Sequence, residues 1–234
     1  KCQGVGEVAI SDHRSTWPSF QELALTVSDA RTGGMLGGKA GVALFHVGAS
    51  PDALSPLWEI VDRTTIPITQ MYPTHVSSRG PTLLDQGIDW VNQGGVVDFT
   101  ADADDENATL DAILYYRSIG VNMSRVTISS DAYGSLPKFH NGVLVGYSVA
   151  QPSSVLNQIR ELVLDFKVPI NEALQLATSN TADYLQLLTK GHIREGGDAD
   201  LILLDQNWNV VYLLANGIVL KSPNYTIEGL FECT

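Results

Sequence analysis

The sequence has little of what would assign it to a class of protein at once. Only two cysteines, Cys2 and Cys233, occur among 234 residues, and no apolar run approaches the roughly 18 residues that span a bilayer. Basic residues are scarce: 14 lysines and arginines against 26 acidic residues give a formal charge of −12. This charge argues against nucleic acid or an anionic membrane as the main partner.

The cysteine usage and the first residues bear on the compartment. A disulfide between the two cysteines is one option, but reduced thiols in a cytoplasmic protein are favoured. The opening residues, KCQGVGE, contain no apolar stretch that resembles a signal peptide. They contain no methionine and come shortly before a predicted strand, so we expect the sequence to be a fragment of a longer protein.

What is present is a hydrophobic content of 44% with 17% charged residues, which fits a soluble globular protein. Short β-rich segments alternate with helical ones. Strands are predicted at 6–11, 41–47, within 66–76, at 95–102 and at 125–131. Helices are predicted between them at about 19–30, with Ser19 as the cap, 52–62, 81–95 and 107–119. This order predicts right-handed βαβ units around a parallel sheet.

The pattern changes in the last part of the chain. Two helices are predicted near 153–166 and 171–187. Residues 199–232 then consist of short strands broken by Asn-Gly and Ser-Pro-Asn turns. We therefore expect two parts, an α/β region over 1–198 and a small β segment over 199–234.

Four predicted strands contain or end in a side chain that could bind a metal: Glu7, His46, His75 and Asp131. The carboxyl ends of parallel strands in a βα barrel converge on one mouth, where such folds do their chemistry. Two imidazoles and two carboxylates form a donor set suited to an ion such as Zn²⁺. We favour metal binding by the set over four separate structural roles.

Other motifs and histidines do not support a site. The segment GGMLGGKA resembles a phosphate-binding loop, but Ala40 replaces the hydroxyl residue and the order of helix and strand is reversed. The acidic run 102–111 lacks the central glycine of a calcium loop. His13, His140 and His192 are interpreted as loop or turn residues.

With these residues in place, the sequence resembles the amidohydrolase superfamily and, within it, the bacterial-type isoaspartyl (β-aspartyl) dipeptidases. The resemblance implies a metal-dependent (β/α)₈ barrel of the TIM type, of which this chain would supply about strands four to eight, followed by part of a small β-sandwich. The segments that carry it are GVGEVAISDHRS, GGMLGGKAGVALFHVG, YPTHVSSRGP, RVTISSDAYGS and KGHIREGGDADLILLD.

The resemblance also implies a site with two zinc ions. His46 and His75 correspond to ligands of the second metal, and Asp131 to a carboxylate that contacts the first. Glu7 stands where the family is expected to carry a carboxylated lysine that bridges both ions. A metal-activated hydroxide would attack the β-peptide bond of an isoaspartyl dipeptide, with Asp131 as general base and then general acid.

Substrate-binding residues follow by position. Arg14 matches an arginine that pairs with a substrate carboxylate, although an ion pair with Asp12 alone is the structural alternative. Ser135 matches a serine that contacts the aspartyl end of the substrate, or else caps a turn. A further family arginine would lie at Ser78, but here the arginine is Arg79, one residue later.

Two other interpretations stay open. The protein could be an amidohydrolase of different chemistry, such as a cyclic amidase or a dihydroorotase-like enzyme, or a non-catalytic scaffold. The scaffold interpretation arises because barrel strands one to three, with their His-x-His pair, are not in this sequence. The expected partner is a small dipeptide, with neither nucleic acid nor membrane involved, and assembly into a homo-oligomer is left open.

Overall fold

The computed structural model describes residues 2–101, 107–141 and 143–227, without the side chains of 135–139. The chain divides into two compact units, residues 1–186 and 187–234. Of the helices in the described part of the chain, none is long and apolar enough to cross a membrane.

The first unit is built on parallel strands. A three-stranded sheet has the order β1-β2-β3, and a second pair joins β4 and β5 in parallel. The backbone N–H of Val76, just after β3, donates to the carbonyl of Asp98 in β4 at 3.2 Å, so the two sheets are neighbours. The strand bounds are β1 (Gly4–Ile10), β2 (Val42–Val47), β3 (Met71–Thr74), β4 (Val97–Thr100) and β5 (Val126–Ser129).

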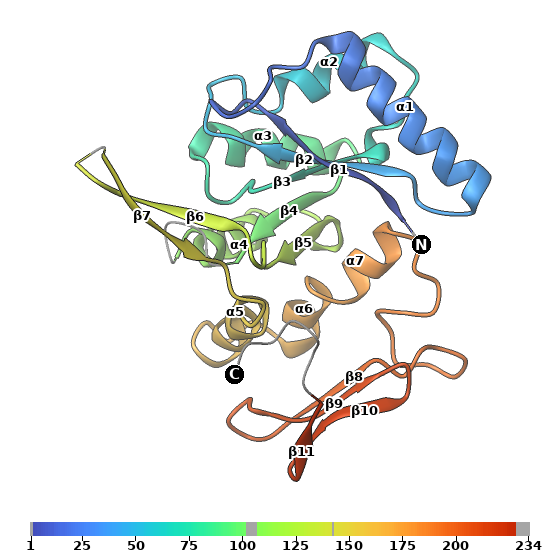
Figure 1. The fold of residues 1–234 in the computed structure, drawn as a ribbon, viewed down its shortest axis with the longest axis vertical. Coiled ribbons are helices and arrows are strands. Elements are labelled where there is room, and N and C mark those ends of the chain that lie inside the picture. The colour runs from blue at the N-terminus through green and yellow to red at the C-terminus, as the bar shows by residue number, and fades with distance from the viewer. Residues whose placement is uncertain (1, 102–106, 142, 228–234) are drawn as a thin grey trace. The chain divides into compact units, whose positions relative to one another are not determined.

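A helix follows each of the first four strands, as the sequence predicts (Figure 1). Ser19 caps the first helix in a reciprocal pair with Glu22, and Leu23 and Val27 turn its buried face towards the sheet. This helix packs on β1 and β2. The helix bounds are α1 (Phe20–Gly37), α2 (Ser55–Arg63), α3 (Pro81–Asn92) and α4 (Ala108–Ser118), with short 3₁₀ turns at Ile68–Gln70 and Met123–Arg125.

The core of this unit lies between the strands and these helices. Strand residues such as Phe45, Met71 and Phe99 are completely buried, as are Trp90 on α3 and Tyr116 on α4. Trp58 packs edge-on against Trp90, and Phe99 against Tyr116, with ring centroids 4.8 and 5.1 Å apart. The first contact joins α2 to α3, and the second joins α4 to β4.

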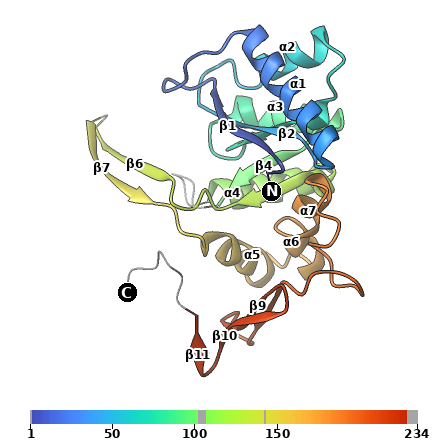
Figure 2. The same ribbon diagram turned by 45° about the vertical axis from the view of Figure 1, so that its right-hand side comes forward.

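After β5 the chain forms a hairpin that the sequence pattern above does not predict. Strands β6 (Ser135–His140) and β7 (Val143–Val149) pair in antiparallel fashion and extend away from the parallel strands, as Figure 2 also shows. Helix α5 (Ser154–Leu164) matches its prediction. The single helix predicted over 171–187 is instead two short ones, α6 (Ile170–Gln175) and α7 (Ser179–Tyr184).

The second unit contains a small antiparallel sheet of order β11-β10-β9-β8. The predicted Asn-Gly turn joins β9 to β10, with positive φ at both Asn216 and Gly217, which suits the hairpin twist. The Ser-Pro-Asn turn leads from β10 to the next strand. The bounds are β8 (Leu201–Leu204), β9 (Val210–Ala215), β10 (Ile218–Ser222) and β11 (Tyr225–Thr226).

Candidate metal and substrate site

Three of the predicted ligands come together where β1, β2 and β3 lie side by side. Glu7 belongs to β1, His46 to β2, and His75 directly follows β3. Their donor atoms all lie within 4.8 Å of one another. Oε1 of Glu7 is 3.6 Å from Nδ1 of His46 and 3.4 Å from Nε2 of His75, and the two rings meet edge-on.

Each imidazole presents one nitrogen to Glu7 and has its other nitrogen bound elsewhere. Nε2 of His46 lies 3.1 Å from Oδ2 of Asp12, and Nδ1 of His75 lies 2.7 Å from Oγ1 of Thr100. Such partners fix the orientation of metal-binding histidines. They also leave the nitrogens that face Glu7 available for a metal.

The donor atoms of the cluster fit a divalent ion. Nε2 of His75 is buried and makes no hydrogen bond, although it faces the Glu7 carboxylate. A buried nitrogen without a hydrogen bond is costly unless another partner, such as a metal, uses its lone pair. Two imidazole nitrogens and a carboxylate oxygen are the ligand types that Zn²⁺ takes.

The charges of the cluster are tightly coupled. The close contacts with His46, and then with His75, lower the pKa of Glu7 to about 2, against the effect of burial. The contact with Glu7, with a further contribution from Asp12, raises the pKa of His46. The cluster without metal therefore favours an ionised glutamate beside a protonated histidine. At pH values below the raised pKa of His46, a metal ion would have to displace its proton.

Asp131 lies farther off but faces the same space. A cavity of about 340 Å³ is lined by Glu7, His75, Asp98 and Asp131 among others. Within the described part of the chain, however, the close ligand cluster comprises Glu7, His46 and His75 and does not include Asp131. The structure thus puts the predicted general base on the wall of the cavity that the cluster borders.

Left-handed backbone marks three of the strand ends around this site. Ser11 after β1, His75 after β3 and Asp131 after β5 have φ values of +52°, +67° and +48°. Non-glycine residues adopt such conformations at a cost, and they concentrate at functional sites. At Asp131 a close turn adds to the constraint, because a Cβ on Gly134 would lie 2.8 Å from the Asp131 carboxyl group.

The predicted substrate-binding residues differ in how the structure places them. Arg14 lies beside the cluster, with Nη2 at 3.4 Å from Nε2 of His46, and it also forms the alternative ion pair with Asp12. Arg79 lies in the segment between β3 and α3, where Ser78 closes a turn on the carbonyl of His75. Ser135 begins β6, and its side chain lies outside the described part of the structure.

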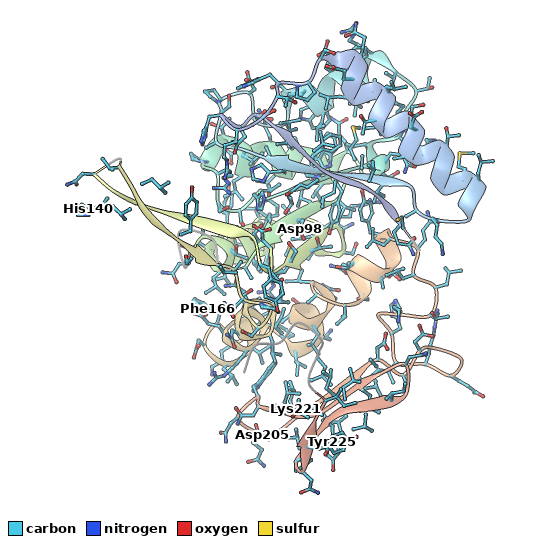
Figure 3. The ribbon with its side chains drawn as sticks, viewed as in Figure 1. Asp98, His140, Phe166, Asp205, Lys221 and Tyr225 are labelled. Carbon is cyan, nitrogen blue, oxygen red and sulfur yellow. The ribbon has the colours of Figure 1, made fainter. Side chains whose placement is uncertain are left out.

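The remaining histidines are not members of the close cluster. His13 is highly exposed and is 3.6 Å from Asp12, as expected of a loop residue. His140 is at the exposed tip of the hairpin, where Figure 3 labels it, and His192 is exposed in the second unit.

Sequence reasoning missed two buried carboxylates. Asp12 was considered only as a partner of Arg14, although it also contacts His46. Asp98 in β4, labelled in Figure 3, had no role assigned to it. An aspartate inside the apolar run VVDF could have signalled the second, since charged residues are seldom buried without a role.

Comparisons with known proteins agree with this geometry. Residues 101–230 match the Amidohydrolase family. A structure of β-aspartyl dipeptidase from Fervidobacterium islandicum AW-1, in complex with β-Asp-Leu dipeptide, is 42% identical with a TM-score of 0.89 and covers 98% of this chain. A second structure of β-aspartyl dipeptidase from that organism is 39% identical, with a TM-score of 0.86 and the same coverage.

The match is partial on the side of these relatives. The chain spans 60 and 59% of the two dipeptidase chains. N-acetylglucosamine-6-phosphate deacetylase from Pasteurella multocida, at 15% identity and a TM-score of 0.55, shares the fold over 86% of this chain and 54% of its own. The resemblance drawn from the sequence is confirmed, and so is the partial α/β barrel followed by a small antiparallel sheet.

Proposed function

The chain belongs to the amidohydrolase family, and from this premise we propose that its protein is a metal-dependent dipeptidase that hydrolyses the β-peptide bond of isoaspartyl dipeptides. One observation carries the proposal: the cluster of Glu7, His46 and His75, with Arg14 beside it, occurs in a chain 42% identical to a β-aspartyl dipeptidase. The substrate is a small acidic dipeptide, and the protein needs no nucleic acid or membrane partner.

The metal would be held by Glu7, His46 and His75, with Zn²⁺ as the expected ion and two ions in the complete site. When bound, such an ion polarises a carbonyl and lowers the pKa of a bound water. The glutamate is negatively charged at all working pH values because its pKa is about 2. Both histidines must be neutral to donate their lone pairs, so metal binding and protonation of His46 compete.

Asp131 would handle the proton of the reaction. As water adds to the amide carbonyl, the carboxylate takes a proton from it. As the C–N bond breaks, the same proton passes to the leaving amine, so that one residue acts as base and then as acid. This role is supported by the position of Asp131 on the wall of the cavity that Glu7 and His75 also line.

Arg14 would bind a carboxylate of the substrate. Asp12 holds its Nε and Nη2 at 3.0 and 3.1 Å, which fixes the plane of the guanidinium, while the side chain remains about half exposed. A fixed guanidinium favours oriented, charge-assisted hydrogen bonds. Such a residue would select acidic dipeptides in spite of the net charge of −12.

The test is hydrolysis of β-Asp-Leu by the protein at the length at which its source produces it, with α-Asp-Leu as the control substrate. We expect activity on the β-linked dipeptide that a chelator abolishes and zinc restores. Arg14→Ala should lower kcat/KM by about 10–100-fold, mainly through KM, because charge-assisted hydrogen bonds are lost. The matched control is Arg160→Ala, at an exposed position of α5.

Two outcomes would contradict the proposal. Turnover of neutral cyclic amides that does not depend on Arg14 would favour a cyclic amidase. A folded protein that neither retains zinc nor hydrolyses any of these substrates would favour a scaffold.

A further inference from the structure

Asp12 uses both carboxylate oxygens on two functional neighbours. It follows β1 and is 5% exposed. Oδ1 accepts from the backbone N–H of Arg14 at 2.7 Å and from its Nε at 3.0 Å. Oδ2 accepts from Nη2 of Arg14 at 3.1 Å and lies 3.1 Å from Nε2 of His46. One buried carboxylate therefore contacts both a candidate metal ligand, His46, and the candidate substrate-binding residue Arg14.

The position of Asp12 is set by the backbone around it. Gly48, just after β2, donates to the carbonyl of Ile10 at 3.0 Å, and Ser50 donates to that of Ser11 at 2.9 Å. A Cβ on Gly48 would lie 2.5 Å from both Cα and Cβ of Asp12. Only a glycine at position 48 lets Asp12 approach the end of β2 this closely. The contact between Asp12 and His46 therefore depends on the backbone packing at the ends of β1 and β2.

The chemistry of this contact selects a tautomer of His46. A carboxylate can only accept a hydrogen bond, so Nε2 of a neutral His46 must carry the hydrogen that points to Asp12. Nδ1 then has the lone pair, and it is Nδ1 that faces Glu7 at 3.6 Å. Without the carboxylate the balance reverses. Nη2 of Arg14, at 3.4 Å from Nε2, can only donate and would favour the tautomer with hydrogen on Nδ1.

We propose that Asp12 is a positioning residue with two roles. It fixes the tautomer of His46 for metal binding, and it fixes the guanidinium of Arg14 for binding of the substrate carboxylate. The second half of this proposal rests on the dipeptidase function proposed above, and the first does not. A residue that only paired with Arg14 would affect substrate binding alone. Asp12 should affect the affinity for metal as well.

The experiment compares Asp12→Asn with the matched charge control Asp62→Asn, at an exposed position of α2. Zinc affinity is measured by competition with a chromophoric chelator on the protein at its natural length. We expect Asp12→Asn to bind zinc about 10–100-fold more weakly, as is typical when the partner of a metal-binding histidine is removed. With zinc saturating, KM for β-Asp-Leu should rise about tenfold, and Asp62→Asn should change neither quantity.

Arg14→Ala separates the two roles. It should raise KM in the same way and leave zinc affinity within about twofold of the wild type, because the contact between Asp12 and His46 remains. An unchanged zinc affinity in Asp12→Asn would overturn the proposal. If the wild type binds zinc and loses it on Asp12→Asn, but does not hydrolyse β-Asp-Leu, the dipeptidase function fails and the metal half of the proposal stands.

A measurement on the wild type keeps the test independent of variant folding. Long-range proton–nitrogen NMR of the zinc-loaded protein reports which nitrogen of His46 carries hydrogen. We expect hydrogen on Nε2 and none on Nδ1. The opposite tautomer would overturn the proposal whatever the variants do.

Discussion

Among single residues, Asp98 is the carboxylate most completely surrounded by protein in the described part of the chain. Oδ2 accepts from Thr74 and Ser129 at 2.7 and 2.6 Å, and Oδ1 accepts from Thr127 at 2.7 Å. The donors come from β3 and β5, the neighbours of β4, so that alternate residues of the flanking strands converge on one acid. Burial outweighs these hydrogen bonds and raises the pKa of Asp98. The group lines the candidate site and also cross-links the strands that form it.

This environment predicts how Asp98 affects folding. Asp98→Ala should destabilise the protein by about 2–4 kcal/mol, because several buried hydroxyls lose their acceptor and a cavity is left. Asp98→Asn keeps the volume and one acceptor oxygen, and should cost less than about 2 kcal/mol. Urea unfolding measures both, with Asp62→Asn as the control. Equal effects of the two variants at Asp98 would contradict the importance of the retained acceptor.

The raised pKa adds a pH dependence of known sign. The native state holds the Asp98 proton to higher pH than the unfolded state, so this contribution to stability is complete below pH 3.8 and is lost as pH rises through the raised pKa. Asp98→Asn does not titrate. Its stability relative to the wild type should therefore improve as pH rises across that range.

For single residues, the sequence predicts which candidate ligands come together better than it predicts which other side chains they contact. Polar residues on successive parallel strands indicated that Glu7, His46 and His75 would meet, since strands of one sheet align their ends, and the three do meet. The role of Asp12 depends on a side-chain contact across 34 residues of sequence, which no local pattern encodes. That these residues bind metal remains a prediction.

At the scale of elements, α1 shows how adjacent glycines differ in function. The helix continues through Gly33 and Gly34 to Gly37, beyond the predicted end at residue 30. Gly34 is buried, and a Cβ there would lie 2.4 Å from Cα of Gly41, at the turn into β2. Gly33 is exposed, and a Cβ at that position would have nothing within 4 Å. The glycine-rich segment that resembles a phosphate loop therefore lets the helix pack closely on the backbone that precedes β2.

The two positions form a matched pair for mutation. Gly34→Ala should destabilise the protein by about 1–3 kcal/mol, because the methyl group is forced against the backbone of Gly41. Gly33→Ala should stabilise it by about 0.5–1 kcal/mol, since alanine is the better helix former and meets open space. Urea unfolding of both variants gives the comparison, and a shift of the same sign in both would refute the packing argument.

Element predictions failed where tertiary contacts decide the backbone. The predicted helix over 171–187 is interrupted after Gln175, where the carbonyl of Leu176 accepts from Ile128 in β5 and Asn180 donates to the carbonyl of Val126. The hairpin β6–β7 had a usable signal, since the Asn141-Gly142 pair separates two runs with strand character. The parallel strands themselves were predicted within a few residues, because their apolar runs are bounded by helical segments.

At the scale of the molecule, one metal ion would link three strands and would thereby stabilise the whole fold. Any ligand that binds only the native state stabilises it, by about 2.7 kcal/mol at a free concentration 100 times Kd. The strands that supply Glu7, His46 and His75 are neighbours in one sheet. Zinc should therefore raise the midpoint of global thermal unfolding as well as support activity.

The size of that stabilisation should depend on pH in a direction set by His46. Because its pKa is raised by Glu7 and Asp12, the protonated histidine stabilises the metal-free fold below pH 6.5, and this contribution is lost as pH rises through the raised pKa. Zinc must displace the same proton, so its affinity increases over that range. We expect saturating zinc to raise the midpoint by roughly 5–10 °C at pH 8 and by less at pH 6. Calorimetry of the metal-stripped protein with and without zinc measures this shift in the midpoint. Glu7→Gln should diminish the shift, and the exposed control His192→Asn should preserve it. A shift that is equal at both pH values would show that zinc does not compete with the His46 proton.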